Sequence, residues 1–206
     1  MRATRPAPAL VAGNVYDKYG TRNPIARRLQ NGFERDMFGL LAGLGPLSSV
    51  LEVGCGEGHM TARLARFFPA ATVVGRDLSP AIVAEARARH PELRFETQSV
   101  YDTAARSERF DLVVACVVLE HVDDPARALA AIAAATRFAF VSVPREPLWR
   151  LLNLARGRYL ARLGDTPGHV QHWSRGALLA LLATRLEVCA VRTPLPWIQA
   201  LGRVRG

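Results

Sequence analysis

Short apolar runs and segments of helical period alternate through the middle of the chain, from about residue 49 to residue 143. The apolar runs, bounded by turn residues, predict buried strands near 49–54, 72–77, 93–97, 110–115 and 138–143. The segments between them predict helices near 59–67, 80–89 and 125–135. This alternation predicts an α/β fold, with a mostly parallel sheet that helices cover on both faces.

Upstream of this core, residues 1–45 are expected to form a tail followed by a helical cap. Asn23-Pro24 is typical of a helix start, because an Asn side chain caps the first amides and proline fits the first turn. Apolar side chains then recur at helical spacing, at Ile25, Leu29, Phe33, Met37 and Leu40.

Downstream of the core the alternation stops. Residues 144–173 are rich in Arg, Leu, Trp and Pro, and we expect them to form a lid inserted after the fifth strand. Residues 174–206 are expected to hold a helix capped by Ser174 and a sixth strand near 186–192.

The composition favours a single domain over residues 1–206, with its sheet core at 46–143, because half of the 206 residues are hydrophobic. No uncharged apolar run reaches the length of a membrane span. The basic N-terminus is not followed by the apolar region and cleavage site of a secretory signal. Three scattered cysteines, without metal-ligand spacing, suit a reducing compartment. We therefore expect a cytoplasmic protein.

The charge of the chain is strongly positive, at +9. Lys18 is the only lysine, so the basic residues are almost all arginine. This bias, together with abundant alanine, is also typical of a GC-rich genome. Attraction of nucleic acid or anionic lipid by a basic surface therefore stays open as an alternative.

A glycine-rich turn carries the clearest chemical signal. The segment Val50–Gly58 reads as a short strand that runs into a turn with glycine at every second position. Glycines allow a sharp turn and leave no Cβ between the backbone and a ligand, and the amides of the next helix point into the gap. A second strand ends at Asp77, whose carboxylate can accept hydrogen bonds from both ribose hydroxyls. These features predict an adenosine-containing cofactor at the carboxyl ends of a parallel sheet.

The turn lacks the dinucleotide fingerprint, because His59 stands where a third glycine would be needed. The pattern Glu52-x-Gly54-x-Gly56-x-Gly58 instead resembles motif I of the class I S-adenosylmethionine-dependent methyltransferases. Later segments match that family in order: 75–79 as motif II, 110–116 as the fourth strand, and 118–125 as the loop and helix start after it. Looser similarity of 144–147 and 168–174 points to the bacterial type 11 group, which acts on small molecules.

The resemblance implies a Rossmann-like sheet of seven strands, and S-adenosylmethionine as the cofactor, with S-adenosylhomocysteine as product. The last strand of that fold is antiparallel, and residues 196–206 leave little room for it, so we expect a brief or distorted strand. The cofactor site carried over from the family comprises Glu52, Gly54, Cys55, Gly56, Gly58, Asp77, Leu78, Ser99, Val100, Cys116 and His121.

Individual roles follow from the same resemblance. Asp77 binds the ribose and Leu78 contacts adenine. Glu52 either binds the methionine ammonium or braces the turn. Ser99 stands where the family often has Asp, facing the adenine amine. The backbone amide of Val100 donates to the adenine ring. The backbone carbonyl of Cys116 is a candidate acceptor for the methionine ammonium.

The cap segment could also contact the cofactor. Tyr16 and Tyr19 could cover the sulfonium by cation–π contact, and Arg22 could pair with the cofactor carboxylate. The alternative is a helix entry packed by its own aromatic side chains.

Glu120-His121 follows the fourth strand, where the methyl group would emerge. His121 could act as a general base for an acceptor hydroxyl, oriented by Glu120. The alternative is that His121 caps the next helix or lines the pocket without transferring a proton. Ubiquinone-type O-methyltransferases carry E-x-x-E-H here, which can hold a divalent ion, but Val117 replaces the first acid. No metal is therefore expected, although a weak site completed by substrate oxygens stays open.

The acceptor pocket is expected from the cap and the lid, with Tyr16, Trp149, Tyr159, His169, His172 and Trp173 as substrate-binding residues. A lid over a small-molecule pocket is favoured over contact with a membrane face or an amphiphilic acceptor. Zinc is not expected, because no cysteine or further histidine joins His169 and His172 at ligand spacing.

These features favour O-methylation of a small, partly apolar acceptor, as in secondary-metabolite, quinone or sugar-lipid metabolism. C- or N-methylation and an RNA-directed methyltransferase are alternatives, and an NAD-dependent dehydrogenase is a weaker one. Nucleic-acid amine methylation is disfavoured, because residues 115–118 lack the N/D-P-P-Y/F motif that grips a flipped base.

Overall fold

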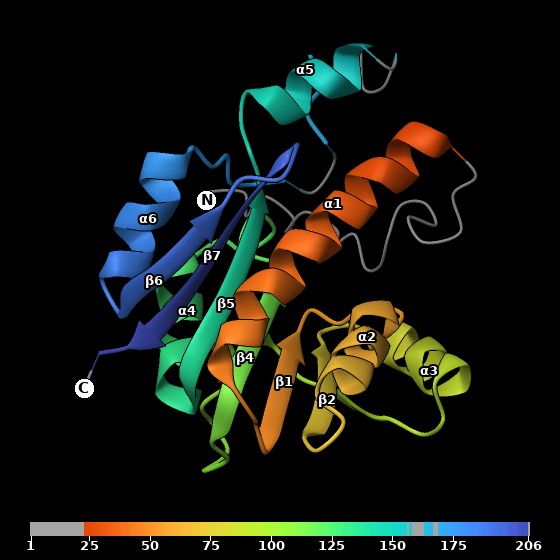
Figure 1. Cartoon of the computed structure of the whole chain (residues 1–206), viewed down its shortest axis with the longest axis vertical. Coiled ribbons are helices and arrows are strands. Elements are labelled where there is room, and N and C mark those ends of the chain that lie inside the picture. The colour runs from red at the N-terminus through yellow and green to blue at the C-terminus, as the bar shows by residue number, and fades with distance from the viewer. Residues whose placement is uncertain (1–22, 156, 158–162, 167–168, 206) are drawn as a thin grey trace, which may run out of the picture.

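A seven-stranded sheet forms the centre of the computed structural model, which describes residues 23–205 apart from 156, 158–162 and 167–168. The strand order is β3-β2-β1-β4-β5-β7-β6, and β7 alone runs in the direction opposite to the other six strands (Figure 1). The strands are β1 Ser49–Val53, β2 Thr72–Asp77, β3 Arg94–Thr97, β4 Phe110–Cys116, β5 Thr136–Pro144, β6 Leu186–Arg192 and β7 Trp197–Val204. The expected Rossmann-like methyltransferase topology is therefore confirmed.

Helices cover both faces of this sheet. Figure 1 shows α1 (Pro24–Leu41) crossing the front of the sheet and α4 (Pro125–Ala135) lying behind it. α1 and α2 (His59–Phe67) share one apolar core with the sheet, and α4 and α6 (Arg175–Ala183) share another. α3 (Pro80–Arg89) packs on the β3 edge of the sheet, where Val83 and Ala86 meet Phe95.

Local capping explains why the helix starts were readable in the sequence. An Asn, Ser or Asp side chain accepts hydrogen bonds from the first helical amides, and three of the four caps are followed by proline. Proline supplies the fixed φ angle of the first turn and lacks an amide that would need a partner. The capping residues are Asn23, Ser79, Asp124 and Ser174.

The last strand differs from the expectation that it would be brief. β7 has eight residues and pairs with β5 and β6 along its length, with one register shift between Val188 and Ala190 of β6. Because β7 lies between two strands, its backbone groups find partners on both sides and Ile198–Gly202 are buried. The expected brevity was wrong, and the irregularity lies in β6.

The lid region contains a further helix, α5 (Leu148–Ala155), beyond the carboxyl end of β5 (top of Figure 1). Tyr16, Tyr19, Arg22 and Tyr159, predicted to bind cofactor or substrate, lie outside the described residues. None of the helices in the described part of the chain has both the length and the apolar character needed to cross a membrane.

A buried arginine lies within the sheet, next to the predicted ribose ligand. The Arg76 side chain is 2% exposed, and its Nε donates to Glu96 at 2.9 Å. Its guanidinium also pairs with Glu108 and stacks over the Phe110 ring, 5.4 Å from the centroid. A charge buried to this extent needs such partners to offset its desolvation.

Arg76→Ala should lower the free energy of unfolding by about 3 kcal/mol, because it leaves a cavity, takes the arginine partner from Glu108 and removes one of the three arginines paired with Glu96. Urea denaturation measures this loss. Arg35→Ala is the control, since the Arg35 side chain is 77% exposed in its pair with Asp36 and should contribute less than about 1 kcal/mol. Similar small losses in both variants would contradict a stabilising role for Arg76.

Candidate functional site

Three glycines after β1 adopt backbone angles that other residues avoid. Gly54, Gly56 and Gly58 have φ values of 66°, 54° and 82°. A Cβ on Gly54 would lie 2.6 Å from Val118 Cγ2, and one on Gly58 would lie 2.7 Å from Phe95 Cζ. At Gly56, no heavy atom of the described residues would come within 4 Å of the added carbon. The turn is therefore packed tightly at its two ends and open at its centre, as a cradle for a ligand requires.

Asp77, at the end of β2, is held against this turn. One carboxylate oxygen accepts from the Gly56 amide at 3.0 Å, and the other accepts from the Ser79 amide at 3.0 Å. The residue is only half-buried, and each carboxylate oxygen has a further lone pair. The fixed carboxylate can therefore accept additional hydrogen bonds from hydroxyl groups. Leu78, which is 48% exposed, offers an apolar surface beside it.

Glu52 lies beneath the turn and is buried, with 2% of its surface exposed. It accepts a hydrogen bond from the Thr61 hydroxyl of α2, at 2.5 Å. Burial, despite this hydrogen bond, raises the pKa of the Glu52 carboxyl to about 8. The hydrogen bond to Thr61 ties the carboxyl to α2 and so braces the turn, while binding of the methionine ammonium by Glu52 stays a prediction.

Ser99 and Val100 lie at the start of the 3₁₀ turn η2 (Val100–Asp102), after β3. The Ser99 hydroxyl accepts from the Tyr101 amide at 3.3 Å, so it caps the turn. Val100 packs against the apolar core on the α4 side. An adenine contact from Ser99 stays a prediction, and the hydroxyl would have to serve it in addition to the cap.

The loop after β4 lies directly against the glycine turn through the Val118–Gly54 contact. It follows Cys116, the last residue of β4, whose side chain approaches Met37 of α1 with sulfur atoms 4.0 Å apart. Val117 follows with φ at 61°, in the left-handed region that a β-branched residue rarely occupies. Its amide donates to the Ser142 carbonyl at 2.9 Å, which fixes the unusual backbone. Such strained residues cluster at functional sites.

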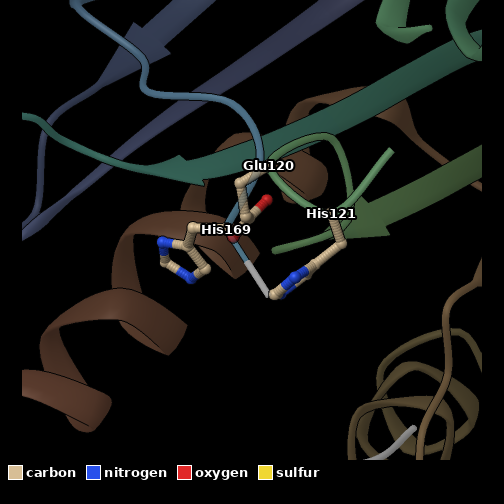
Figure 2. Close-up of side chains that lie close together, drawn as sticks. All are labelled: Glu120, His121 and His169. Atoms are coloured by element: carbon tan, nitrogen blue, oxygen red, sulfur yellow. The ribbon is translucent and has the colours of Figure 1, made fainter. Parts of the chain in front are cut away.

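Glu120 and His121 of this loop lie close to His169 (Figure 2). Glu120 is 1% exposed, and its backbone carbonyl accepts from the amides of Val170 and Gln171 at 2.8 and 3.1 Å. These bonds bring His169 beside His121, with ring centroids 5.0 Å apart and planes at 74°. One nitrogen or oxygen atom from each of the three side chains lies within 4.8 Å of the other two.

Trp149 adjoins this cluster and in turn contacts Trp197. Trp149 of α5 stacks with His169 at a centroid distance of 6.2 Å and lies 5.9 Å from Trp197 of β7. Its Nε1 donates to the Thr166 hydroxyl at 2.9 Å, which ties α5 to the loop that carries His169. Trp197 was missed in the sequence, because only the β5–β7 pairing brings it to this edge.

Two other residues predicted to bind substrate have structural partners elsewhere. His172 Nε2 lies 2.9 Å from the Asp165 carboxylate. Trp173 is 8% exposed and belongs to the apolar core on the α4 and α6 side of the sheet. Substrate contacts from these two side chains stay a prediction.

The sequence also matches known proteins. A family model described as a methyltransferase domain matches residues 50–138. A trans-aconitate 2-methyltransferase from Methylobacterium radiotolerans is 38% identical over 125 residues, which cover 56% of this chain and 47% of that protein. A ubiquinone biosynthesis O-methyltransferase from Xanthomonas campestris is 33% identical over 164 residues, which cover 75% of this chain and 66% of that protein. The chain spans less than half the length of the trans-aconitate methyltransferases that it matches, and only 32% of the one from Deinococcus radiodurans.

The fold has counterparts among solved structures. The magnesium protoporphyrin IX methyltransferase of Synechocystis PCC 6803, with bound S-adenosylhomocysteine, superposes with a TM-score of 0.67 at 19% identity and covers 90% of both chains. The same enzyme with bound S-adenosylmethionine gives a TM-score of 0.64. At such low sequence identity, this structural similarity supports the fold alone. The assignment to a family rests on the sequence motifs and on the more similar relatives. The chain belongs to the class I S-adenosylmethionine-dependent methyltransferases.

Proposed function

We propose that the protein transfers the methyl group of S-adenosylmethionine to a hydroxyl of a small, partly apolar acceptor. The observation that carries this proposal is the contact between two loops at one edge of the sheet. The glycine turn and Asp77 form one side of the site, and the Glu120–His121–His169 cluster forms the other. The Gly54–Val118 contact joins them, with no room for even one additional methyl group.

The residues of the glycine turn and its neighbours each suit one part of an adenosine ligand. S-adenosylmethionine supplies, when bound, a methyl group on a sulfonium that an acceptor atom can attack. Asp77 accepts hydrogen bonds from the ribose hydroxyls, and its carboxylate is already oriented by the Gly56 and Ser79 amides. Leu78 contacts adenine, and the open centre of the turn at Gly56 admits the ribose and the methionine portion. Holding the donor rigidly beside the acceptor lowers the entropic part of the barrier.

The acceptor side combines polar and apolar surfaces. His121 is three residues beyond Val118, which packs on the turn, and its imidazole can take a proton as an acceptor hydroxyl attacks. Trp149 supplies aromatic surface next to His169, and its contact with Trp197 extends that surface, which favours an acceptor with an apolar part. The relative from Xanthomonas campestris is named as an O-methyltransferase of ubiquinone biosynthesis, and this supports oxygen as the atom that is methylated.

The function is tested by incubating the protein with isotopically labelled S-adenosylmethionine and fractionated bacterial extract. Mass spectrometry should then find a small molecule that has gained one labelled methyl group on oxygen. A labelled carbon, nitrogen or RNA product would contradict the proposed O-methylation of a small molecule.

Asp77→Ala should weaken S-adenosylhomocysteine binding by about 10-fold to 100-fold, because the ribose hydroxyls lose a charged acceptor. Isothermal titration calorimetry measures the affinity. Glu187→Gln on β6 is the matched control, since that carboxylate is 60% exposed at the far edge of the sheet and should bind as the wild type does. An Asp77→Ala variant that is folded and binds normally would show that the ribose lies elsewhere.

His121→Ala should cut kcat by at least about 100-fold, because the acceptor proton would lose the group on which its removal depends. The dissociation constant for S-adenosylhomocysteine should stay within about 3-fold of the wild-type value. Both are measured on the same preparation, with the acceptor found in extract. Equal losses in turnover and cofactor affinity would assign His121 to the cofactor pocket alone.

A further inference from the structure

We propose that Glu120, His121 and His169 bind one divalent transition-metal ion at the acceptor side of the site. From the sequence alone only a weak site completed by substrate oxygens stayed open here, because Glu120-His121 offers two ligands and His169 lies 48 positions beyond His121. The fold supplies the third ligand from the lid. Metal binding at these residues does not depend on the proposed function, whereas the catalytic role of the ion rests on that function.

The distances suit a shared ion. Ligand atoms around zinc lie about 2.0–2.2 Å from the metal, and hence roughly 3–4 Å from one another. One ligand atom from each of the three side chains lies within 4.8 Å of the other two. To share one ion, the three ligand atoms would have to move closer to one another by about 2 Å or less, which rotations about side-chain bonds can supply.

The backbone on both sides of the cluster is fixed. The Glu120 carbonyl accepts from two successive amides of the lid, at Val170 and Gln171. The His121 amide donates to the Val118 carbonyl at 2.9 Å. On the other side, Trp149 stacks with the His169 ring. Ligands held in this way lose little freedom when an ion binds, which favours affinity.

The chemistry of the donors selects the class of metal. Two imidazoles and one carboxylate suit zinc, iron, nickel or copper, whereas magnesium and calcium prefer oxygen ligands. Glu120 is 1% exposed, so a divalent cation beside it would offset the desolvation of an ionised carboxylate. Catalytic zinc sites commonly have three protein ligands, including the set of two histidines and one glutamate, and leave a position for water or substrate.

An ion here would change how the acceptor loses its proton. A hydroxyl oxygen on the open position would have a lowered pKa and could release its proton to solvent. That oxygen would then attack the methyl carbon, while the carbon–sulfur bond breaks with its electron pair left on sulfur. His121 would act as a metal ligand in this form of the protein and as a base in the metal-free form.

The test is a titration of the metal-free 206-residue chain with Co²⁺, followed by visible absorption, and with Zn²⁺ by calorimetry. We expect one ion per chain and cobalt bands typical of four or five ligands. Glu120→Gln and His169→Ala should each weaken binding by at least about 10-fold. His172→Ala is the matched control, because that imidazole lies three positions away in the same loop, faces Asp165 and should leave metal affinity unchanged.

The proposal fails if no cobalt band appears at one equivalent, or if Glu120→Gln and His169→Ala bind metal as the wild type does. It also fails if His172→Ala is the variant that loses the ion. Circular dichroism establishes that each variant is folded. S-adenosylhomocysteine binding, measured on the same samples, separates the two proposals: a protein that binds the nucleoside but no metal retains the proposed function and loses the metal site.

Discussion

The close approach of Gly54 to Val118 is the constraint on which the site depends. A hydrogen in place of a side chain allows the loop after β4 to pack onto the turn after β1. The parallel pairing of β1 with β4 brings both loops to the same edge of the sheet. A cofactor held by one loop would therefore lie next to whatever chemistry the other loop presents, without any motion of domains.

The two loops are stabilised by different means. The turn after β1 is held by the Asp77 carboxylate, which accepts from the Gly56 amide, and beneath it by the buried Glu52 carboxyl, which accepts from the Thr61 hydroxyl. The loop after β4 contains Val117 in a left-handed conformation, fixed by a hydrogen bond to the Ser142 carbonyl of β5. Strain at this position orients the residues that follow, and the amides of Val170 and Gln171 then tie Glu120 to the lid.

Much of the fold could be predicted from local signals. Caps followed by proline, as at Ser79-Pro80 and Asp124-Pro125, fixed helix starts that agree with the structure. The glycine turn and Asp77 were readable because they are dictated by backbone conformation within a few residues. The length of β7 was misjudged, since it depends on pairing with both β5 and β6 rather than on local composition.

The acceptor side was harder to predict because its parts come from distant segments. His169 joins His121 only through the hydrogen bonds between the lid and the Glu120 carbonyl, and no spacing in the sequence encodes that contact. Trp197 reaches Trp149 through an antiparallel strand pairing. Arg76 was also missed, since a charged residue in a strand gives no sign that Glu96 and Glu108 will enclose it.

A crystal structure of the complex with S-adenosylhomocysteine is the most direct measurement. We expect both ribose hydroxyls within hydrogen-bonding distance of the Asp77 carboxylate, and the sulfur atom facing the space beside Glu120, His121 and His169. An adenosine group bound away from the glycine turn, or a sulfur atom pointing away from that cluster, would contradict this expectation.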